Sequence, residues 1–357
     1  MTWVNPPHFS FDPGTLLLRE SRTSIEKGQR IMGGESQCVP ARAAADSRTS
    51  PAGSLHVLPT ARVLHVEFAA EGAAVLPCLP TTSLHGALAA ALMRSSREAH
   101  AALFEPVGAR EPIRGVTDHP PLPMVLAPMS PVLGTAPLRL SDGESWTARV
   151  VLFGSTAIGF EAAIVAGLYE AAARGLGVAL GGQRGQFLVR QIASESVHLS
   201  RVEPSGSESG CTLSLETPSR LKHRGALVSE LSAAALWEAL VRRTDALARA
   251  YGGGSLHDGR LTEIEPPFRV TASEISLVHV RRSSSRQGRC MTWPGMVGTL
   301  QIEVAEDDPE IFKLARSLLA CAEYLQIGKG TSFGFGRVRF SASVPRTALS
   351  HMQSETS

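Results

Sequence analysis

The stretch IGKGTSFGFGRVRF, residues 327–340, decides how we interpret this chain. It contains four glycines, three phenylalanines, two arginines and one lysine. Glycine tolerates positive φ angles and close backbone approach, so such a loop can offer backbone N–H groups to an anion. A helical apolar pattern over 309–325 precedes it, and alternating aromatic residues from Phe333 to Phe340 predict a strand after it. This order differs from the P-loop and from the dinucleotide-binding fingerprint, and a purely steric turn is the alternative.

Composition excludes several classes of protein. The chain has 357 residues, 43% of them hydrophobic, and a formal net charge of +2, which allows one large or two modest cores. Lysine occurs at four positions, so arginine supplies 35 − 4 = 31 of the basic residues. Arginine suits phosphate contacts, although a GC-rich genome produces the same bias. Five scattered cysteines without a C-x-x-C pair, and no long apolar run, predict a cytoplasmic protein with neither metal nor other cofactor and no membrane span.

The hydrophobic pattern predicts an α+β fold built from two similar units. Residues 1–58 have little apolar periodicity and predict a poorly ordered extension. We assign 59–140 to a first ferredoxin-like unit with a proline-rich connector, 141–345 to a second such unit with the glycine-rich loop, and 346–357 to a tail. The first unit opens with a strand over 61–69 and a helix over 84–93, capped by Thr82 or Ser83. A second glycine-rich turn, at 181–190, also leads from a helix into a strand.

Several segments together carry a family resemblance. Residues 328–338 resemble the C-terminal glycine-rich loop of the RAMP superfamily, and are most similar to that of the Cas6-type endoribonucleases that cut precursor CRISPR RNA within its repeats. Residues 84–88, 217–222, 242–243, 251–252, 282–287 and 293–299 resemble that family in the same order. The likeness extends over about residues 60–341. It implies tandem ferredoxin-like (RRM-like) folds and a CRISPR repeat RNA as partner, with other subunits of a CRISPR effector complex as further candidate partners.

The resemblance also implies a reaction. The ribose 2′-OH attacks the adjacent phosphorus without a metal, which leaves a 2′,3′-cyclic phosphate and a 5′-OH. Such a step needs a base, an acid and positive charge near the phosphate. The family places a histidine near the end of the first helix and a helper at its start, positions that map to His100 and His85. Histidine at the helper position departs from the family pattern. Either the two histidines form an acid–base pair, or His85 is the main residue and His100 is incidental.

Cationic residues near the loop are the candidates for RNA binding. An arginine-rich segment over 281–289 predicts salt-dependent phosphate contacts, and an ordinary solvated hairpin is the alternative. His65 lies on a strand face and is predicted to be structural, whereas His223 lies in a basic loop where RNA contact and plain exposure are equally favoured. A non-catalytic RNA-binding RAMP subunit remains the alternative function. The predicted RNA-binding residues are Arg281, Arg282, Arg286, Arg289, Lys329, Arg337, Lys222, Gly328, Gly330, Gly334 and Gly336.

Overall fold

The structure is a computed structural model that describes residues 55–106, 120–180, 183–203, 210–256, 261–284, 289–305 and 307–342. Most of the predicted extension and the predicted tail at 346–357 lie outside these ranges. The predicted extension is too long by four residues, because Leu55 and Leu58 are buried in the hydrophobic core and Val57 accepts a hydrogen bond from the backbone N–H of Gly253. No helix among the described residues is long and apolar enough to cross a membrane.

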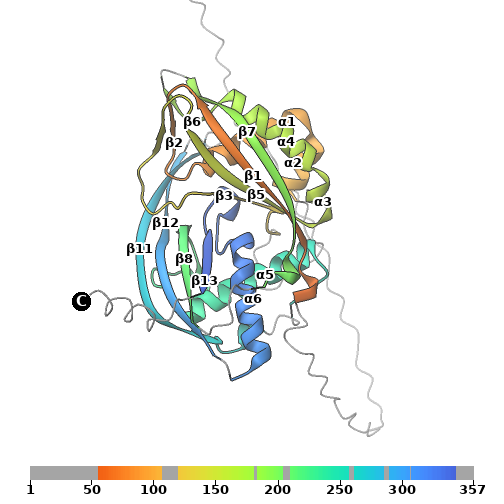
Figure 1. The fold of residues 1–357 in the computed structure, drawn as a ribbon, viewed down its shortest axis with the longest axis vertical. Helices are drawn as coiled ribbons and strands as arrows, with labels where there is room; N and C mark the ends of the chain where they lie inside the picture. The colour runs from red at the N-terminus through yellow and green to blue at the C-terminus, as the bar shows by residue number, and fades with distance from the viewer. Residues whose placement is uncertain are drawn as a thin grey trace, which may run out of the picture. The chain divides into compact units, whose positions relative to one another are not determined.

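The first lobe, residues 55–203, contains a five-stranded antiparallel sheet. Its elements are β1 (Thr60–Glu71), α1 (Thr81–Ser95), α2 (Arg97–Phe104), β3 (Met124–Pro128), β5 (Ser145–Phe153), α3 (Gly154–Gly159), α4 (Glu161–Arg174), β6 (Leu176–Leu180) and β7 (Gln183–His198). The strand order is β3-β5-β1-β7-β6, and a small second sheet pairs β2 (Ala74–Leu76) with β4 (Leu138–Leu140). Without β6, this is the βαββαβ order of a ferredoxin-like fold (Figure 1).

The second lobe, residues 210–342, repeats the same topology. Its main elements are β8 (Gly210–Ser219), α5 (Ala233–Tyr251), β11 (Phe268–Ser284), β12 (Arg289–Val304), α6 (Pro309–Leu325) and β13 (Val338–Ala342), with sheet order β11-β12-β8-β13. Smaller elements are η2 (Leu199–Arg201), β9 (Lys222–His223), β10 (Ala226–Leu227) and η4 (Thr331–Phe333). The tandem ferredoxin-like α+β prediction is confirmed.

The predicted boundary between the two units is wrong. We placed it at residue 140, but β5 and β7 pair with β1 along most of its length, so the first sheet extends to residue 198. The predicted proline-rich connector contains β3, an edge strand of this sheet that ends at Pro128. An edge position suits proline because proline has no N–H to donate to a neighbouring strand.

The strand β1 contributes to both hydrophobic cores because its side chains alternate between the two faces of the sheet. Leu64, Val66 and Phe68 pack with the apolar residues of α1 and α4. On the opposite face, Ala61 and Val63 join the core of the second lobe. Each fully buried aliphatic or phenylalanine side chain contributes about 1.5–3 kcal/mol relative to exposure. The two lobes therefore share apolar packing, which fixes the elements that bring the candidate site together.

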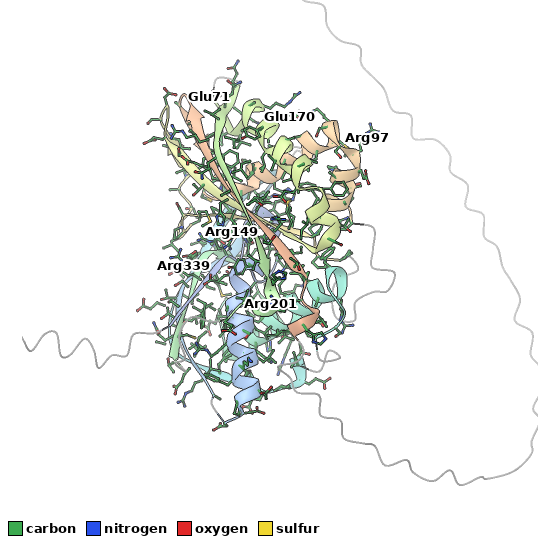
Figure 2. All side chains as sticks on the ribbon, turned by 45° about the vertical axis from the view of Figure 1, so that its right-hand side comes forward. Glu71, Arg97, Arg149, Glu170, Arg201 and Arg339 are labelled. Atoms are coloured by element: carbon green, nitrogen blue, oxygen red, sulfur yellow. The ribbon has the colours of Figure 1, made fainter. Side chains whose placement is uncertain are left out.

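Polar contacts add to this connection between the lobes. Arg149 of β5 is buried and donates to the carbonyl of Glu323 in α6, while its guanidinium lies 5.6 Å from the ring centre of Tyr324. Figure 2 labels Arg149 on the central strands of the first lobe and Arg339 on β13 of the second. Burial, more than any other cause, holds the pKa of Arg149 below its usual value. This arginine is therefore part of the interior rather than of an RNA-binding surface.

Candidate active site

The glycine-rich loop is closely packed against other parts of the protein. Gly328, Gly330, Gly334 and Gly336 all have positive φ. A Cβ atom on Gly334 would lie 2.0 Å from the Oγ1 of Thr81, and one on Gly336 would lie 1.9 Å from the carbonyl oxygen of Ile327. Because side chains rarely adopt these φ values and no space remains for them, glycine is required at both positions.

Several loop amides are already used inside the protein. The N–H of Lys329 donates to the carbonyl of Arg220 (2.9 Å) and that of Gly336 donates to the carbonyl of Pro218 (3.1 Å). The N–H of Arg337 donates to the Oγ1 of Thr217 at 2.8 Å. These N–H groups are therefore not available to an anion, contrary to our prediction for the loop. The predicted strand over 333–340 is also too long, since a 3-10 turn spans Thr331–Phe333 and β13 starts at Val338.

Thr81 of α1 joins the loop to the first lobe through a hydrogen bond. Helix α1 begins at Thr81, whose Oγ1 donates to the carbonyl of Phe333 at 2.9 Å. The predicted cap by Thr82 or Ser83 does not form. The N-cap position is Pro80, without a side-chain cap, and the hydroxyl of Thr82 donates backwards to the carbonyl of Leu79. The contact from Thr81 places Phe333 beside the next turn of the helix.

His85 lies on that turn, between aromatic rings from two other elements. Its ring centre is 4.0 Å from that of Phe333 and 5.1 Å from that of Phe104. The Nε2 atom of His85 is buried and has no hydrogen-bond partner. Burial, and then the nearby charge of Arg282, lower the pKa of His85 to about 3. The imidazole is therefore neutral near pH 7 and can accept a proton.

His100 lies close to the same place. It is within α2 rather than at the end of the first helix, because α1 ends at Ser95 and Ser96 caps a new helix by accepting from the N–H of Ala99. His100 is buried and stacks on Phe104, with ring centres 5.3 Å apart. The chain turns back after α1, as a shared site requires, so that one phenylalanine contacts both histidines.

An arginine and a tryptophan complete the cluster from the second lobe. The guanidinium carbon of Arg282, on β11, lies 3.8 Å from the ring centre of Phe333 and 5.0 Å from that of Trp293. Arg220 lies 4.7 Å from the Trp293 ring centre and donates to the carbonyl of Pro294. Among the described residues, Arg282 has no hydrogen-bond acceptor and no ion-pair partner. We call His85, His100, Phe104, Arg282, Trp293 and Phe333 the histidine–arginine cluster.

Phe104 and Trp293 were not among the residues predicted for the site. Residues 293–298 lie within β12, although their Pro-Gly pair is typical of a turn. A Cβ on Gly295 would lie 2.7 Å from the Cβ of Pro218, so this glycine serves the packing of β12 on β8. The family-like segments were an available signal for part of the cluster, since His85, Arg282 and Trp293 each lie in one of them.

Two predicted lysines lie beside the cluster. Lys222 on β9 and Lys329 in the loop are near enough that the ammonium group of Lys222 lowers the pKa of Lys329, after the larger effect of partial burial. Arg220 lowers that pKa further. Like charges held together in this way favour binding of an anion such as a phosphate.

Arg337 does not fit its predicted role in RNA binding. Its side chain is 4% exposed and forms an ion pair with Glu216 at 2.8 Å. The same guanidinium donates to the carbonyls of Pro128 (2.7 Å) and Met129 (2.6 Å) in the first lobe. Arg337 therefore connects the two lobes, because its partners lie in both of them. The same contacts occupy the guanidinium and leave it poorly placed to bind RNA.

The other predicted residues lie elsewhere or cannot be placed. Arg281 is exposed and 3.9 Å from the Sγ of Cys290, while Arg286 and the side chain of Arg289 lie outside the described residues. The Nδ1 of His223 is 2.5 Å from a carboxylate oxygen of Glu238.

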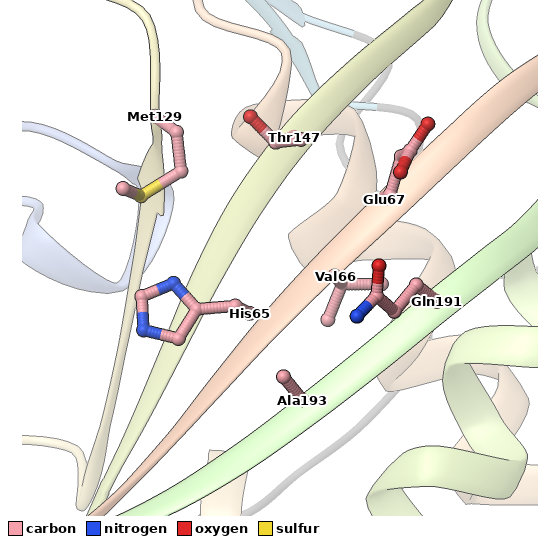
Figure 3. A pocket seen from close by; sticks show the side chains of 7 residues that line it. All are labelled: His65, Val66, Glu67, Met129, Thr147, Gln191 and Ala193. Atoms are coloured by element: carbon pink, nitrogen blue, oxygen red, sulfur yellow. The ribbon is translucent and has the colours of Figure 1, made fainter.

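His65 faces a shallow pocket on the first sheet. It lies with Glu67, Thr147 and Gln191 on the open face, and its Nε2 is 3.3 Å from a carboxylate oxygen of Glu195 (Figure 3). This pairing agrees with a structural role for His65, and the pocket contains no residue of the histidine–arginine cluster.

Two family models match separate parts of the chain. The model described as the CRISPR-associated endoribonuclease Cas6 matches residues 213–338, which span the second lobe from β8 into β13. This part of the chain, less than half of its length, is therefore similar to the Cas6-type CRISPR-associated endoribonucleases. A model described as an N-terminal domain matches residues 58–207, which correspond to the first lobe.

Solved structures of Cas6 proteins share the fold of this chain. A product complex of a Cas6 from Thermus thermophilus superposes with a TM-score of 0.55 at 18% identity, covering 79% of this chain and 100% of that chain. A product complex of a second Cas6 gives 0.51 at 20% identity, with coverage of 79% and 100%. A partial Cas6-RT-Cas1–Cas2 complex gives 0.51 at 10% identity, covering 81% of this chain and 48% of that one. No protein with a curated description matches the sequence.

Proposed function

We propose that this chain cuts precursor CRISPR RNA within its repeats, without a metal ion, to give 2′,3′-cyclic phosphate and 5′-OH ends. The observation that carries the proposal is a neutral histidine, His85, with an unpartnered Nε2, beside an arginine that has no acidic partner among the described residues. This combination supplies a proton acceptor and a positive charge, which are two of the three requirements of the reaction.

In the proposed reaction, Nε2 of His85 accepts the proton of the ribose 2′-OH. The 2′-oxygen forms a bond to phosphorus as the bond between phosphorus and the 5′-oxygen breaks. The leaving 5′-oxygen then takes a proton from a separate donor. His100 is that donor if the two histidines form a pair, and water is the donor if His100 only positions Phe104.

The substrate we propose is a CRISPR repeat RNA. The cationic residues beside the cluster, Arg220, Lys222, Arg282 and Lys329, would bind its backbone, so affinity should fall with added salt. Exposed aromatic faces are scarce at the site because Phe333 and Trp293 are covered by arginines. Recognition should therefore depend on RNA shape and phosphates more than on base stacking. Structures of similar Cas6 proteins as product complexes, and in a Cas6-RT-Cas1–Cas2 complex, support RNA and other CRISPR proteins as partners.

Cleavage in EDTA tests the proposal. The purified chain is mixed with RNA transcribed from the CRISPR repeat of its own genome, and one discrete cut with a cyclic phosphate end is expected. A single 2′-deoxy substitution at the cut should abolish it, because the attacking oxygen is then missing. Cleavage that needs a divalent ion, or that survives the substitution, would contradict the mechanism.

A non-catalytic RNA-binding subunit is the second candidate function. One observation favours it, namely that the Nε2 of His85 is buried in the free protein and has to become accessible before it can meet a 2′-OH. This candidate predicts tight, salt-sensitive binding of the repeat RNA with no cut under any of the conditions above.

A further inference from the structure

The histidine–arginine cluster links substrate binding to the chemistry of His85. We propose that Arg282 binds the RNA phosphate at the cut and that this contact makes His85 a better proton acceptor, so that the site becomes fully basic only when RNA is bound. The inference rests on the proposed function, and it adds a control step to that function.

The Arg282 guanidinium lies against two aromatic rings, and none of its N–H groups has a hydrogen-bond acceptor among the described residues. The group lies 3.8 Å from the Phe333 ring centre and 5.0 Å from that of Trp293. Trp293 is itself held by Phe335 and Arg220, at 5.5 Å and 4.7 Å. Stacking uses the π faces of a guanidinium, whereas hydrogen bonds form at its N–H edges. Since no described residue accepts from these N–H groups, a phosphate can take them in bidentate fashion.

The charge of Arg282 also reaches His85. His85 lies on α1, and three other elements pack around it: α2 presents Phe104 and, behind it, the titratable His100; η4 presents Phe333; and β11 presents Arg282. Among the described residues, Arg282 is the charged group that acts on His85, and no carboxylate opposes it. A positive neighbour disfavours a protonated imidazole, so the free protein keeps His85 neutral and weakly basic.

A bound phosphate would reverse this effect. Its negative charge would offset that of Arg282 and would itself favour the protonated imidazole at short range. An opposite charge within about 4–6 Å raises a histidine pKa by about one to three units. Burial, the larger cause of the low value, would remain, so the pKa of His85 in the complex should rise towards its usual range without reaching it.

Histidine-selective NMR on the full chain measures this directly. The signal of His85 is assigned as the one missing in His85→Gln, and it is followed from pH 5 to 8 with and without RNA. The probe is the repeat RNA with a 2′-deoxy substitution at the mapped cut, or the unmodified RNA if no cut is found. We expect no titration of His85 in the free protein and the onset of protonation below about pH 6 in the complex.

Variants separate Arg282 from the rest of the site. Arg282→Gln should remove the RNA-induced change at His85 and slow cleavage about 100-fold at saturating RNA. Arg282→Lys keeps the charge but loses the flat stacking face, so it should restore part of both effects. Arg269→Gln is the matched control on the same strand, because Arg269 is exposed and paired with Glu303, and the His85 signal should respond to RNA as in the unmodified chain.

The outcomes distinguish this inference from the proposed function. If the unmodified chain cuts RNA but His85 responds equally to RNA in Arg282→Gln, the inference is wrong and the function stands. If His85 responds to RNA through Arg282 and no RNA is cut, the coupling stands and the proposed cleavage is wrong. A His85 signal that titrates near pH 6.5 in the free protein would also overturn the inference.

Discussion

Each ferredoxin-like lobe of this protein has a glycine-rich turn between its last helix and its last strand, at residues 175–177 in the first lobe and 328–336 in the second. In the first lobe, Gly175 and Gly177 follow α4, and the chain forms the extra strand β6. A Cβ on Gly177 would lie 2.3 Å from the carbonyl oxygen of Val75 in β2, so this turn packs within its own lobe. In the second lobe, Gly334 packs against Thr81 of the other lobe.

This difference between the two turns shows what the glycines of residues 327–337 contribute to the structure. Both turns use positive φ and missing side chains for close packing, so neither property is specific to RNA binding. The second turn differs because its close approach connects the lobes and holds Phe333 against His85. The function that we propose for this site therefore depends on which residues the glycines bring together, and not on free backbone amides in the loop.

The largest effect is expected from the residue that the second turn covers. His85→Gln should slow RNA cleavage about 10²- to 10⁴-fold, because the proposed general base is lost, while RNA binding remains. The measurement is single-turnover cleavage at saturating RNA. His100→Ala decides between the two-histidine pair and His85 alone, since a loss of similar size indicates a pair. His65→Gln, on the open face of the first sheet, is the control and should leave the rate unchanged.

The ion pair next to the second turn should have the next largest effect. Arg337→Met leaves Glu216 in the interior without one of its two arginine partners, so the free energy of unfolding should fall by about 3–5 kcal/mol. Urea denaturation measures this. The double variant Arg337→Met with Glu216→Leu removes both members of the pair and should recover much of the loss. An unchanged midpoint in the single variant would show that the connection between the lobes does not need this arginine.

Equivalent substitutions in the two turns test the comparison most directly. Gly334→Ala and Gly177→Ala both introduce a Cβ at positive φ without space for it, so each should cost about 2–4 kcal/mol of stability. Only Gly334→Ala should also slow cleavage, because it displaces the contact between Thr81 and Phe333. Thermal unfolding and cleavage well below the unfolding temperature separate the two effects. Equal loss of cleavage in both folded variants would contradict our distinction between the turns.

The smallest effect is a dependence of stability on pH. His85 has a pKa of about 3 in the folded protein, whereas an unfolded histidine has a pKa of about 6.5. Below pH 6.5, His85 is protonated in the unfolded chain but stays neutral in the folded protein. Stability from this group is therefore complete above pH 6.5 and falls by up to about 1.4 kcal/mol per pH unit towards the folded pKa. Comparing His85→Gln with the unmodified chain by urea denaturation at pH 7 and 5.5 should show the smaller loss in the variant.

Local patterns were sufficient for much of the fold. The apolar stripes of α1, α4, α5 and α6 indicate helices. The order of strands and helices along the chain indicates ferredoxin-like units. The boundary between the lobes was wrong because β5 and β7 look like strands of either sheet, and pairing with β1 is a long-range choice. The Pro-Gly pair in 293–298 favours a bend by local propensity, whereas cross-strand packing against β8 keeps this segment extended.

By itself, the sequence determined the type of chemistry: histidines at 85 and 100, arginines over 281–289, and a glycine loop in an order typical of one family. Only the tertiary structure decided which of these residues meet. Arg337 and Arg282 look equally cationic along the chain, yet one is paired with Glu216 in the interior and the other stacks on Phe333 beside His85. The physical reason is that burial and charge pairing depend on contacts between residues about 200 positions apart, which no local pattern records.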